Sequence, residues 1–341
     1  MARLHVPLMT AVDSRRSERP SVLFVYPIDA TFIRQDQELL ERFCSVAPFH
    51  FTERGQYRSL LLRVADSDIV FSWFALGFAA VANAAACLLG RASIVISGGW
   101  DVTRLPEIGY GRLLTPRGTL VAKMAVSSAD QVLAFSSWSE RAIRALAPNC
   151  TVDTAPLGVD VDKFGPNAKE NLVVCVANVN RENLIRKGLA TFAKASRLLP
   201  DVPFHLVGRH LDDTGEELKS LAGSNMSLTG WIPQGELVDL LARAKVYAQP
   251  SYIEGFGLAL AEAMASGCVP VVTESGAMPE VVGETGLFTP YGDPEGLARS
   301  IRKALASMNG KAARARIVNN FSISRRFDAL RNTVERVWPR N

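Results

Sequence analysis

The chain has 341 residues, of which 48% are hydrophobic and 21% are charged, and its formal net charge is +4. This length allows two domains of ordinary size, and the balance of apolar and charged residues excludes wholesale disorder. The weak positive charge, without a basic stripe interleaved with aromatic residues, argues against nucleic acid and suits phosphorylated ligands or an anionic membrane surface.

The N-terminal residues 1–20 are polar and basic, and we expect them to form a flexible arm. No apolar h-region or cleavage site occurs there, so we do not expect a signal peptide. The five cysteines are odd in number and scattered, which predicts buried thiols in a reducing compartment. The expected location is the cytoplasm, and the arginines of the arm slightly favour peripheral contact with the inner face of a membrane.

From residue 21 the chain alternates short apolar strands with helices, which predicts a parallel, doubly wound sheet. The predicted strands are 21–26, 69–71, 93–97 and 131–135, and the predicted helices are 35–43, 74–89, 120–129 and 141–146. The sequence Thr154–Asp160 breaks the alternation. We therefore place a first Rossmann-like domain at residues 21–157.

The alternation restarts after this break and predicts a second Rossmann-like domain at residues 158–320. Its predicted strands are 172–177, 204–207, 227–229, 246–249 and 269–273, and its predicted helices are 189–199, 236–244, 258–265 and 294–308. Residues 321–341 contain a separate amphipathic helix, with apolar side chains at helical spacing from Phe327 to Trp338. Two such α/β domains suggest a cleft between them, because ligands of open sheets bind beyond the carboxyl ends of the strands.

Two glutamates near the start of the predicted helix 258–265 indicate a ligand site. Seven residues separate Glu254 from Glu262, and glycines 255 and 257 lie between them. The unpaired amides and the positive dipole end of a helix N-terminus attract anions, and glycine lets a ligand approach the backbone. Phosphate on the amides and hydroxyl groups on the carboxylates would suit a sugar nucleotide. Taken alone, Glu262 is better explained as compensation of the helix dipole and Glu254 as a solvated loop charge, and it is the pair together with the glycines that favours a site.

Three cations follow the first strand of the second domain, namely Arg181, Arg186 and Lys187. In a parallel sheet this position lies at the same edge as the Glu254 loop, so these side chains could reach a diphosphate. Lys187, followed by the helix-opening Gly188, is the strongest candidate of the three.

With these residues assembled, the chain resembles the retaining glycosyltransferases of family GT4, which have the GT-B architecture. The resemblance runs from about Val22 to the end. It is carried by EGFGLALAEAMASG at residues 254–267, which matches the E-x7-E signature, by TGWIP at 229–233 and by PLGVD at 156–160. It implies two Rossmann-like domains facing a cleft, with the C-terminal helix returning to the N-terminal domain.

The resemblance also implies roles for individual residues. Glu254 would bind hydroxyl groups of the donor sugar, Glu262 the ribose and Lys187 the diphosphate. The segment around Ile232 would meet the nucleotide base. The backbone of Gly255, Phe256, Gly257 and Leu258 would contact the sugar and the diphosphate.

Two departures from the family pattern affect the expected site. The family's glycine–arginine pair before the lysine is replaced by Ala177-Asn178, so Arg181 or Arg186 would supply the second cation. The family's histidine in the first domain is also missing, and Asp101 could occupy that region as a catalytic carboxylate or as an ordinary turn aspartate.

The predicted reaction is metal-independent transfer of a sugar from a nucleoside diphosphate sugar to an acceptor hydroxyl, with retention, in glycan, polysaccharide or glycolipid biosynthesis. Asp101, Lys187 and Glu254 are the expected catalytic residues, and no cofactor is expected. A glycan, a lipid-linked sugar or a small molecule would be the acceptor, contacted by Arg34, Asp36 and Tyr110. The D-x-D pairs at 66–68 and 160–162 lie at unsuitable positions for a metal.

Two other functions remain open on the sequence. A nucleotide-sugar epimerase or hydrolase with the same fold would convert the donor without an acceptor. A non-catalytic nucleotide-sugar-binding subunit would bind the donor tightly without turnover.

Overall fold

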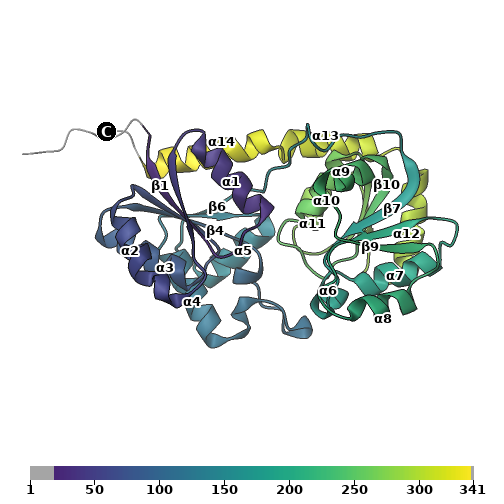
Figure 1. Ribbon diagram of the computed structural model, residues 1–341, viewed down its shortest axis with the longest axis horizontal. Coiled ribbons are helices and arrows are strands. Elements are labelled where there is room, and N and C mark those ends of the chain that lie inside the picture. The colour runs from purple at the N-terminus through teal and green to yellow at the C-terminus, as the bar shows by residue number, and fades with distance from the viewer. Residues whose placement is uncertain (1–18, 339–341) are drawn as a thin grey trace, which may run out of the picture.

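The computed structural model describes residues 19–338, which form two α/β domains joined side by side (Figure 1). The predicted flexible arm therefore lies almost entirely outside the described residues. The first domain has a parallel six-stranded sheet in the order β2-β1-β3-β4-β5-β6. Its strands are β1 (Ser21–Tyr26), β2 (Ser45–His50), β3 (Ile69–Trp73), β4 (Ala92–Ser97), β5 (Gln131–Ala134) and β6 (Val152–Thr154).

Helices cover both faces of this first sheet. They are α1 (Thr31–Glu41), α2 (Tyr57–Ala65), α3 (Gly77–Leu88), α4 (Pro116–Ser127) and α5 (Ser137–Leu146). Ser136 is the N-cap of helix α5, because its hydroxyl accepts a hydrogen bond from the Ser139 amide. Between β4 and α4 the chain forms a long irregular loop, residues 98–115, with three short 3₁₀ turns.

The second domain repeats this architecture with the strand order β12-β11-β10-β7-β8-β9, again all parallel. Its strands are β7 (Glu170–Val176), β8 (Phe204–Val207), β9 (Met226–Gly230), β10 (Ala244–Gln249), β11 (Val269–Thr273) and β12 (Leu287–Thr289). Its helices are α6 (Arg181–Arg186), α7 (Leu189–Arg197), α8 (Thr214–Leu221), α9 (Gln234–Arg243), α10 (Leu258–Ala265), α11 (Met278–Val282), α12 (Pro294–Ala306) and α13 (Gly310–Asn320).

The last helix, α14 (Ile323–Val337), returns to the first domain, as expected. It follows α13 almost end to end, and α13 lies over the second domain whereas α14 lies over the first (Figure 1). The Phe327 ring packs edge-on against Phe43 of the first domain. Arg326 donates two hydrogen bonds to Asp36 of α1, at 2.9 and 2.6 Å, and both side chains are almost fully buried. This contact fixes the end of the chain to the first domain.

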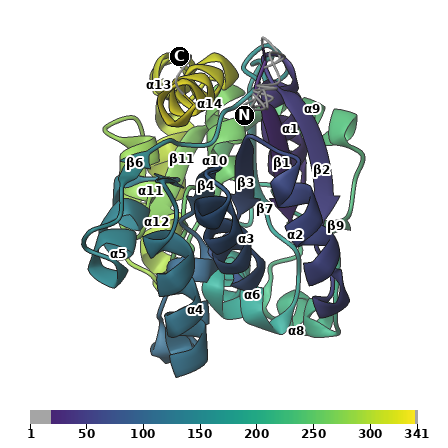
Figure 2. The same ribbon diagram turned by 90° about the vertical axis from the view of Figure 1, so that its left-hand side faces the viewer.

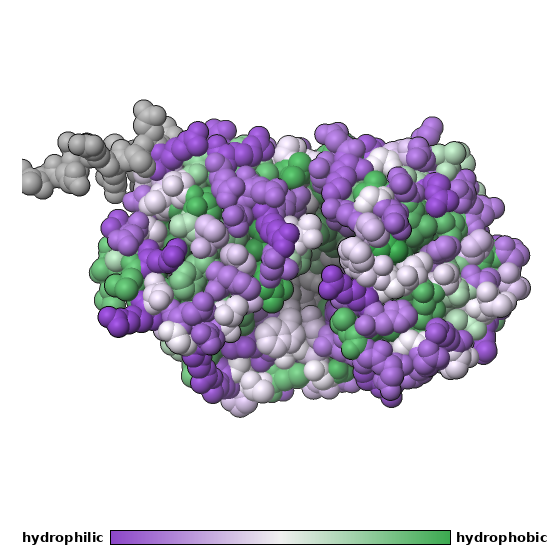
Figure 3. Space-filling view, in the orientation of Figure 1, coloured by the Kyte–Doolittle hydropathy of each residue, from purple (hydrophilic) through white to green (hydrophobic). Residues whose placement is uncertain are grey.

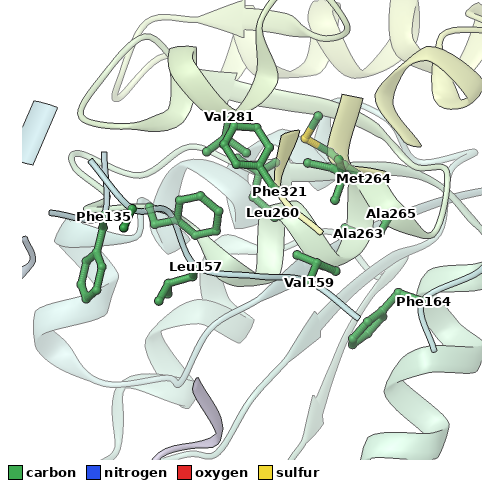
Figure 4. Close-up of a cluster of buried hydrophobic side chains, with 14 of the residues drawn as sticks. Phe135, Leu157, Val159, Phe164, Leu260, Ala263, Met264, Ala265, Val281 and Phe321 are labelled. Carbon is green, nitrogen blue, oxygen red and sulfur yellow. The ribbon is translucent and has the colours of Figure 1, made fainter. Parts of the chain in front are cut away.

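One hydrophobic core is continuous across the junction of the two domains. Leu157 and Val159 of the linker, Leu260 and Met264 of α10, and Phe321 between the last two helices all belong to it (Figure 4). The linker and the crossing helices therefore bury their apolar side chains against both domains. Within residues 19–338 no helix is long and apolar enough to cross a membrane.

The cysteine prediction is confirmed in part. All five cysteines are free and four are buried, but Cys87 on the outer side of α3 is exposed.

Candidate active site

The candidate site lies where the strand order of the second sheet reverses, between β7 and β10. These neighbouring strands are connected to helices on opposite sides of the sheet, so their carboxyl ends leave a crevice of the kind that binds nucleotides. The chain after β7 supplies Lys187, and the chain after β10 supplies Glu254. Figure 3 shows a groove between the two domains, and cavities there are lined by residues from both.

Close backbone contacts hold the Glu254 loop in place. The Glu254 carbonyl accepts a hydrogen bond from the Ala277 amide at 2.9 Å, and the Tyr252 amide donates to the Arg186 carbonyl at 2.7 Å. Gly188, with φ of +64°, lies so close to this loop that an added Cβ would be 2.0 Å from the Pro250 carbonyl oxygen. Only glycine suits both the left-handed backbone and this approach. The loop and the Lys187 turn therefore form one packed unit.

Lys187 and Glu254 meet in a partly solvent-shielded ion pair. The Lys187 Nζ lies 2.5 Å from Glu254 Oε1, and the Ser251 hydroxyl donates to the same oxygen at 2.9 Å. Burial raises the pKa of Glu254, but Lys187, Arg186 and the Ser251 hydroxyl together outweigh it and hold that pKa below its usual value. Glu254 is therefore ionised at neutral pH.

Of the two predicted arginines, the structure brings Arg186 to the site. Its side chain is largely buried, it acts electrostatically on Glu254, and its guanidinium lies 4.9 Å from the ring centroid of Tyr110 in the first domain. Arg181 lies at the other end of α6, where its exposed side chain pairs with Glu217. Arg186 is thus the second cation beside Lys187, and Arg181 faces away from it.

The N-terminus of α10 provides backbone donors next to this pair. Gly257, with φ of +91°, precedes the helix, and the amides of its first turn lack intrahelical acceptors. The Phe256 side chain is buried and packs against Phe321, so only its backbone is available to a ligand. The predicted backbone contacts of residues 255–258 are compatible with this arrangement.

Glu262 lies one turn further along α10 and lines a cavity of about 340 Å³. Arg34 and Gln35 of α1, Lys163 of the linker, Gln234 of α9 and Leu258 also line it, so both domains contribute. Burial raises the pKa of Glu262 to about 7, and Lys163 only partly opposes this effect. Ile232, the predicted base-binding residue, is half-buried two residues before Gln234. The cavity therefore places predicted donor residues beside Arg34.

Asp101 is completely buried and shapes the loop after β4. Its carboxylate accepts hydrogen bonds from the Ala75 amide at 2.8 Å, the Ser97 hydroxyl at 2.7 Å and the Gly99 amide at 3.1 Å. With its oxygens engaged in this way, Asp101 orients the Gly98–Gly99 turn. A direct catalytic role stays a prediction, and the geometry favours positioning.

The Gly98–Gly99 turn meets the α10 loop across the cleft. An added Cβ on Gly255 would lie 2.4 Å from the Gly98 carbonyl oxygen. The Ser136 hydroxyl donates to the Gly255 carbonyl at 2.9 Å, and the Ser137 amide donates to Glu280 Oε2 at 2.8 Å. The two domains are thus in direct contact at the Glu254 loop.

The prediction that Asp36 contacts an acceptor is wrong. Both of its oxygens accept hydrogen bonds from Arg326, and it is 1% exposed. The other two predicted acceptor residues do lie at the cleft, since Arg34 lines the Glu262 cavity and Tyr110 packs over Arg186.

Sequence reasoning missed Arg209, which lies beside Trp231 of the segment 229–233 that was predicted to meet the base. Arg209 follows β8, and its guanidinium lies 5.8 Å from the centroid of the exposed Trp231 ring, which follows β9. The Gly208-Arg209 pair directly after a buried strand was the available signal. Gly208 approaches the Ala177 carbonyl too closely for any Cβ.

Comparison with known proteins shows what the second domain is similar to. Residues 170–307 match the family described as glycosyl transferases group 1. A mannosyltransferase of Mycolicibacterium hassiacum, MMP alpha-(1->4)-mannosyltransferase, is 36% identical over 140 residues, covering 38% of this chain and 33% of the relative. The GDP-mannose-dependent alpha-(1-6)-phosphatidylinositol monomannoside mannosyltransferase of Mycobacterium tuberculosis is 28% identical over 257 residues, covering 66% of this chain and 63% of the relative. The chain thus spans less than two thirds of the length of either.

Among solved structures, the fold resembles that of HepE from Anabaena, determined in complex with UDP and glucose. The TM-score is 0.74 with 18% sequence identity, covering 93% of this chain and 100% of the other. The GT-B fold expected from the sequence is confirmed, as is the resemblance to GT4-type glycosyltransferases.

Proposed function

We propose that this chain, whose residues 170–307 match the family of group 1 glycosyl transferases, is a retaining glycosyltransferase that uses a nucleoside diphosphate sugar without a metal ion. The observation that carries the proposal is the meeting of Lys187, Arg186 and Glu254 beside the N-terminus of α10. Two cations and free helix amides suit a diphosphate, and an ionised carboxylate suits sugar hydroxyls.

In the proposed reaction, the bond between the anomeric carbon and the diphosphate oxygen breaks while the acceptor oxygen bonds to the same face of that carbon. The acceptor proton passes to an oxygen of the departing diphosphate, so no enzyme nucleophile is consumed. Negative charge grows on the diphosphate as it departs. Lys187, Arg186 and the first-turn amides of α10 stabilise that charge.

We further propose GDP-mannose as the donor. Both curated relatives described above are named as mannosyltransferases, and one of them as GDP-mannose-dependent. The acceptor hydroxyl enters from the first domain, beside Tyr110 and Arg34, and belongs to a glycan, a glycolipid or a small glycoside.

Thermal stabilisation of the purified protein tests the donor site, because a ligand that binds only the folded state raises its melting temperature. GDP, UDP, ADP and their sugars are compared with EDTA present throughout. We expect selective stabilisation by GDP and GDP-mannose in the wild type and its loss in Lys187→Ala. Lys194→Ala, on the exposed side of α7, is the matched control. Equal stabilisation of the wild type and Lys187→Ala by GDP and GDP-mannose would contradict the proposed site.

Incubation of GDP-mannose with and without an acceptor separates the alternative functions. Release of GDP that depends on the acceptor is expected of a transferase. Conversion of the donor without any acceptor would instead indicate an epimerase or hydrolase, and binding without turnover a non-catalytic subunit.

A further inference from the structure

Three helices form one outer face of the first domain. Helices α2, α3 and α4 lie next to one another on the side turned to the viewer in Figure 2, and α3 contacts both of its neighbours. The Asn83 side-chain amide of α3 donates to the Ala125 carbonyl of α4 at 2.9 Å. The inner sides of the helices bury small and branched apolar residues against the sheet. We call their solvent-facing side the α2–α4 face.

The α2–α4 face is apolar where a surface helix is normally polar. Its exposed apolar side chains are Leu61 and Leu62 on α2, Val81 and Leu88 on α3, and Leu120 and Met124 on α4. Leu88 is 87% exposed, Leu62 is 63% exposed and Leu120 is 59% exposed. Apolar side chains gathered on one face of a domain indicate an interaction surface.

The charges on this face have one sign. The three helices contain no aspartate or glutamate, and their exposed charged residues are Arg58, Arg63, Arg117 and Lys123. The nearest carboxylates along the chain lie beyond the helix ends and are Glu53, Asp66, Asp68 and Asp130. Two copies of this face brought together would oppose like charges, so the face is complementary to an anionic partner.

We propose that the α2–α4 face docks the protein onto an anionic phospholipid bilayer. Leucines that enter the boundary between headgroups and acyl chains, flanked by arginine and lysine at the level of the phosphates, are what holds an interfacial helix on such a surface. The three helices together present a broad surface of this kind, whereas the outer side of α14 carries both signs of charge.

The same face leads to the mouth of the cleft. Helix α4 packs against two 3₁₀ turns of the loop after β4, Trp100–Val102 and Arg112–Leu114. Trp100 is 45% exposed, and the loop between these turns supplies Tyr110 to the cleft. A bilayer held against α4 would present a lipid-linked acceptor close to this opening. That consequence rests on the proposed function, whereas the docking itself does not.

Co-sedimentation of the full chain with vesicles tests the proposal. Vesicles of phosphatidylcholine alone are compared with vesicles that also contain phosphatidylglycerol, at low and high salt. We expect binding to the anionic vesicles only, weakened by salt. The double variant Leu62→Gln/Leu88→Gln should reduce partitioning at least tenfold, and Arg117→Gln/Lys123→Gln should reduce its salt dependence. Leu198→Gln/Leu211→Gln, which alters two exposed leucines of the second domain, is the matched control.

Two outcomes would overturn the proposal. The first is equal sedimentation of the wild type and the Leu62→Gln/Leu88→Gln variant, or no sedimentation of either. The second is a dimer that this variant dissociates, which would make the face a subunit interface. GDP release measured with a water-soluble acceptor and no vesicles checks the proposed function separately and should be the same in both proteins.

Discussion

At the level of single residues, the site depends on a carboxylate kept ionised by its neighbours. Glu254 is 8% exposed, and burial alone would favour its neutral form. Lys187, Arg186 and the Ser251 hydroxyl reverse that preference. The same contacts orient the carboxylate before a ligand arrives, so part of the cost of organising the site is already met during folding.

Replacement of Glu254 by glutamine preserves the size of the side chain but removes its charge and leaves Lys187 without its anionic partner. We expect kcat to fall by about 10²-fold or more, the size of effect seen when one oriented polar group is lost from an active site. Steady-state kinetics with the donor established by the stabilisation assay measure this change. Glu295→Gln, an exposed carboxylate in the first turn of α12, serves as control. A kcat within twofold of the wild type would argue against a role for Glu254 in the reaction.

Glu262 predicts a specific dependence of stability on pH. Because burial raises its pKa from 4.5 to about 7, the folded state binds this proton more tightly than the unfolded state. Its contribution to stability is therefore fully present below about pH 4.5 and is lost as the pH rises to about 7. The melting temperatures of the wild type and of Glu262→Gln are measured from pH 4 to 8. The value for the wild type minus the value for the variant should decrease as the pH rises from about 4.5 to about 7. A difference independent of pH would contradict the raised pKa.

The sequence predicted Glu254, Glu262 and Lys187 because local spacing places them at the start of a helix and after a strand. It could not decide which of Arg181 and Arg186 lies at the site. Both are on the same short helix, and because they are five residues apart their side chains point in different directions. Asp36 was misassigned because its partner, Arg326, is 290 residues away along the chain. No local pattern reports such a contact.

At the level of elements, the alternation of strands and helices was predictable, and the edges of the sheets were not. Strand β2 was missed because it is an edge strand that is mostly exposed and contains Pro48. Strand β6 has only three residues and lies at the opposite edge, where the sequence suggested a linker. The amphipathic helices α2 and α8 were also missed, since each is short. The central strands were recognised because burial on both faces makes them continuously apolar.

The turn between α6 and α7 provides a test at this level. Gly188→Ala would place a Cβ 2.0 Å from the Pro250 carbonyl and strain a left-handed backbone by about 1–2 kcal/mol. We expect both a lower melting temperature and weaker donor binding, because Lys187 and the Glu254 loop move apart.

Gly90→Ala is the matched control for this substitution. Gly90 also has φ of +64°, but its Cβ would meet no atom within 4 Å. Its variant should lose stability from backbone strain alone and bind the donor normally. Equal donor affinity in the two variants would show that the Pro250 contact does not position Lys187.

For the whole molecule, the chain's end ties the domains together. Arg326 and Asp36 are almost fully buried, and Arg326 also donates to the Ala155 carbonyl at the start of the linker. Asp36→Asn leaves a buried guanidinium without its counter-charge, for which we expect a loss of about 3–5 kcal/mol in the free energy of unfolding. Denaturant unfolding measures it. The KM for the acceptor should not change, whereas a raised KM with unchanged stability would restore Asp36 as an acceptor residue.

Gly255 determines how closely the two domains approach each other at the Glu254 loop. Gly255 faces the Gly98 carbonyl so closely that any side chain would hold the domains apart, while the backbone of Gly255 is not in the left-handed region. Each domain should therefore fold normally in Gly255→Ala, yet the cleft should close less completely. Because closure excludes water and brings Tyr110 to Arg186, we expect kcat to fall more than donor affinity.

Small-angle scattering with saturating nucleotide separates this cause from a local effect on the loop. Gly255→Ala should show a larger radius of gyration than the wild type, and Gly235→Ala, where an added Cβ meets no atom within 4 Å, should match the wild type. If kcat fell while the radius of gyration stayed the same, the glycine would act through the donor contact alone. The contact between Gly255 and Gly98 would then be a consequence of the way the crossing helices hold the domains together, and it would not control the reaction.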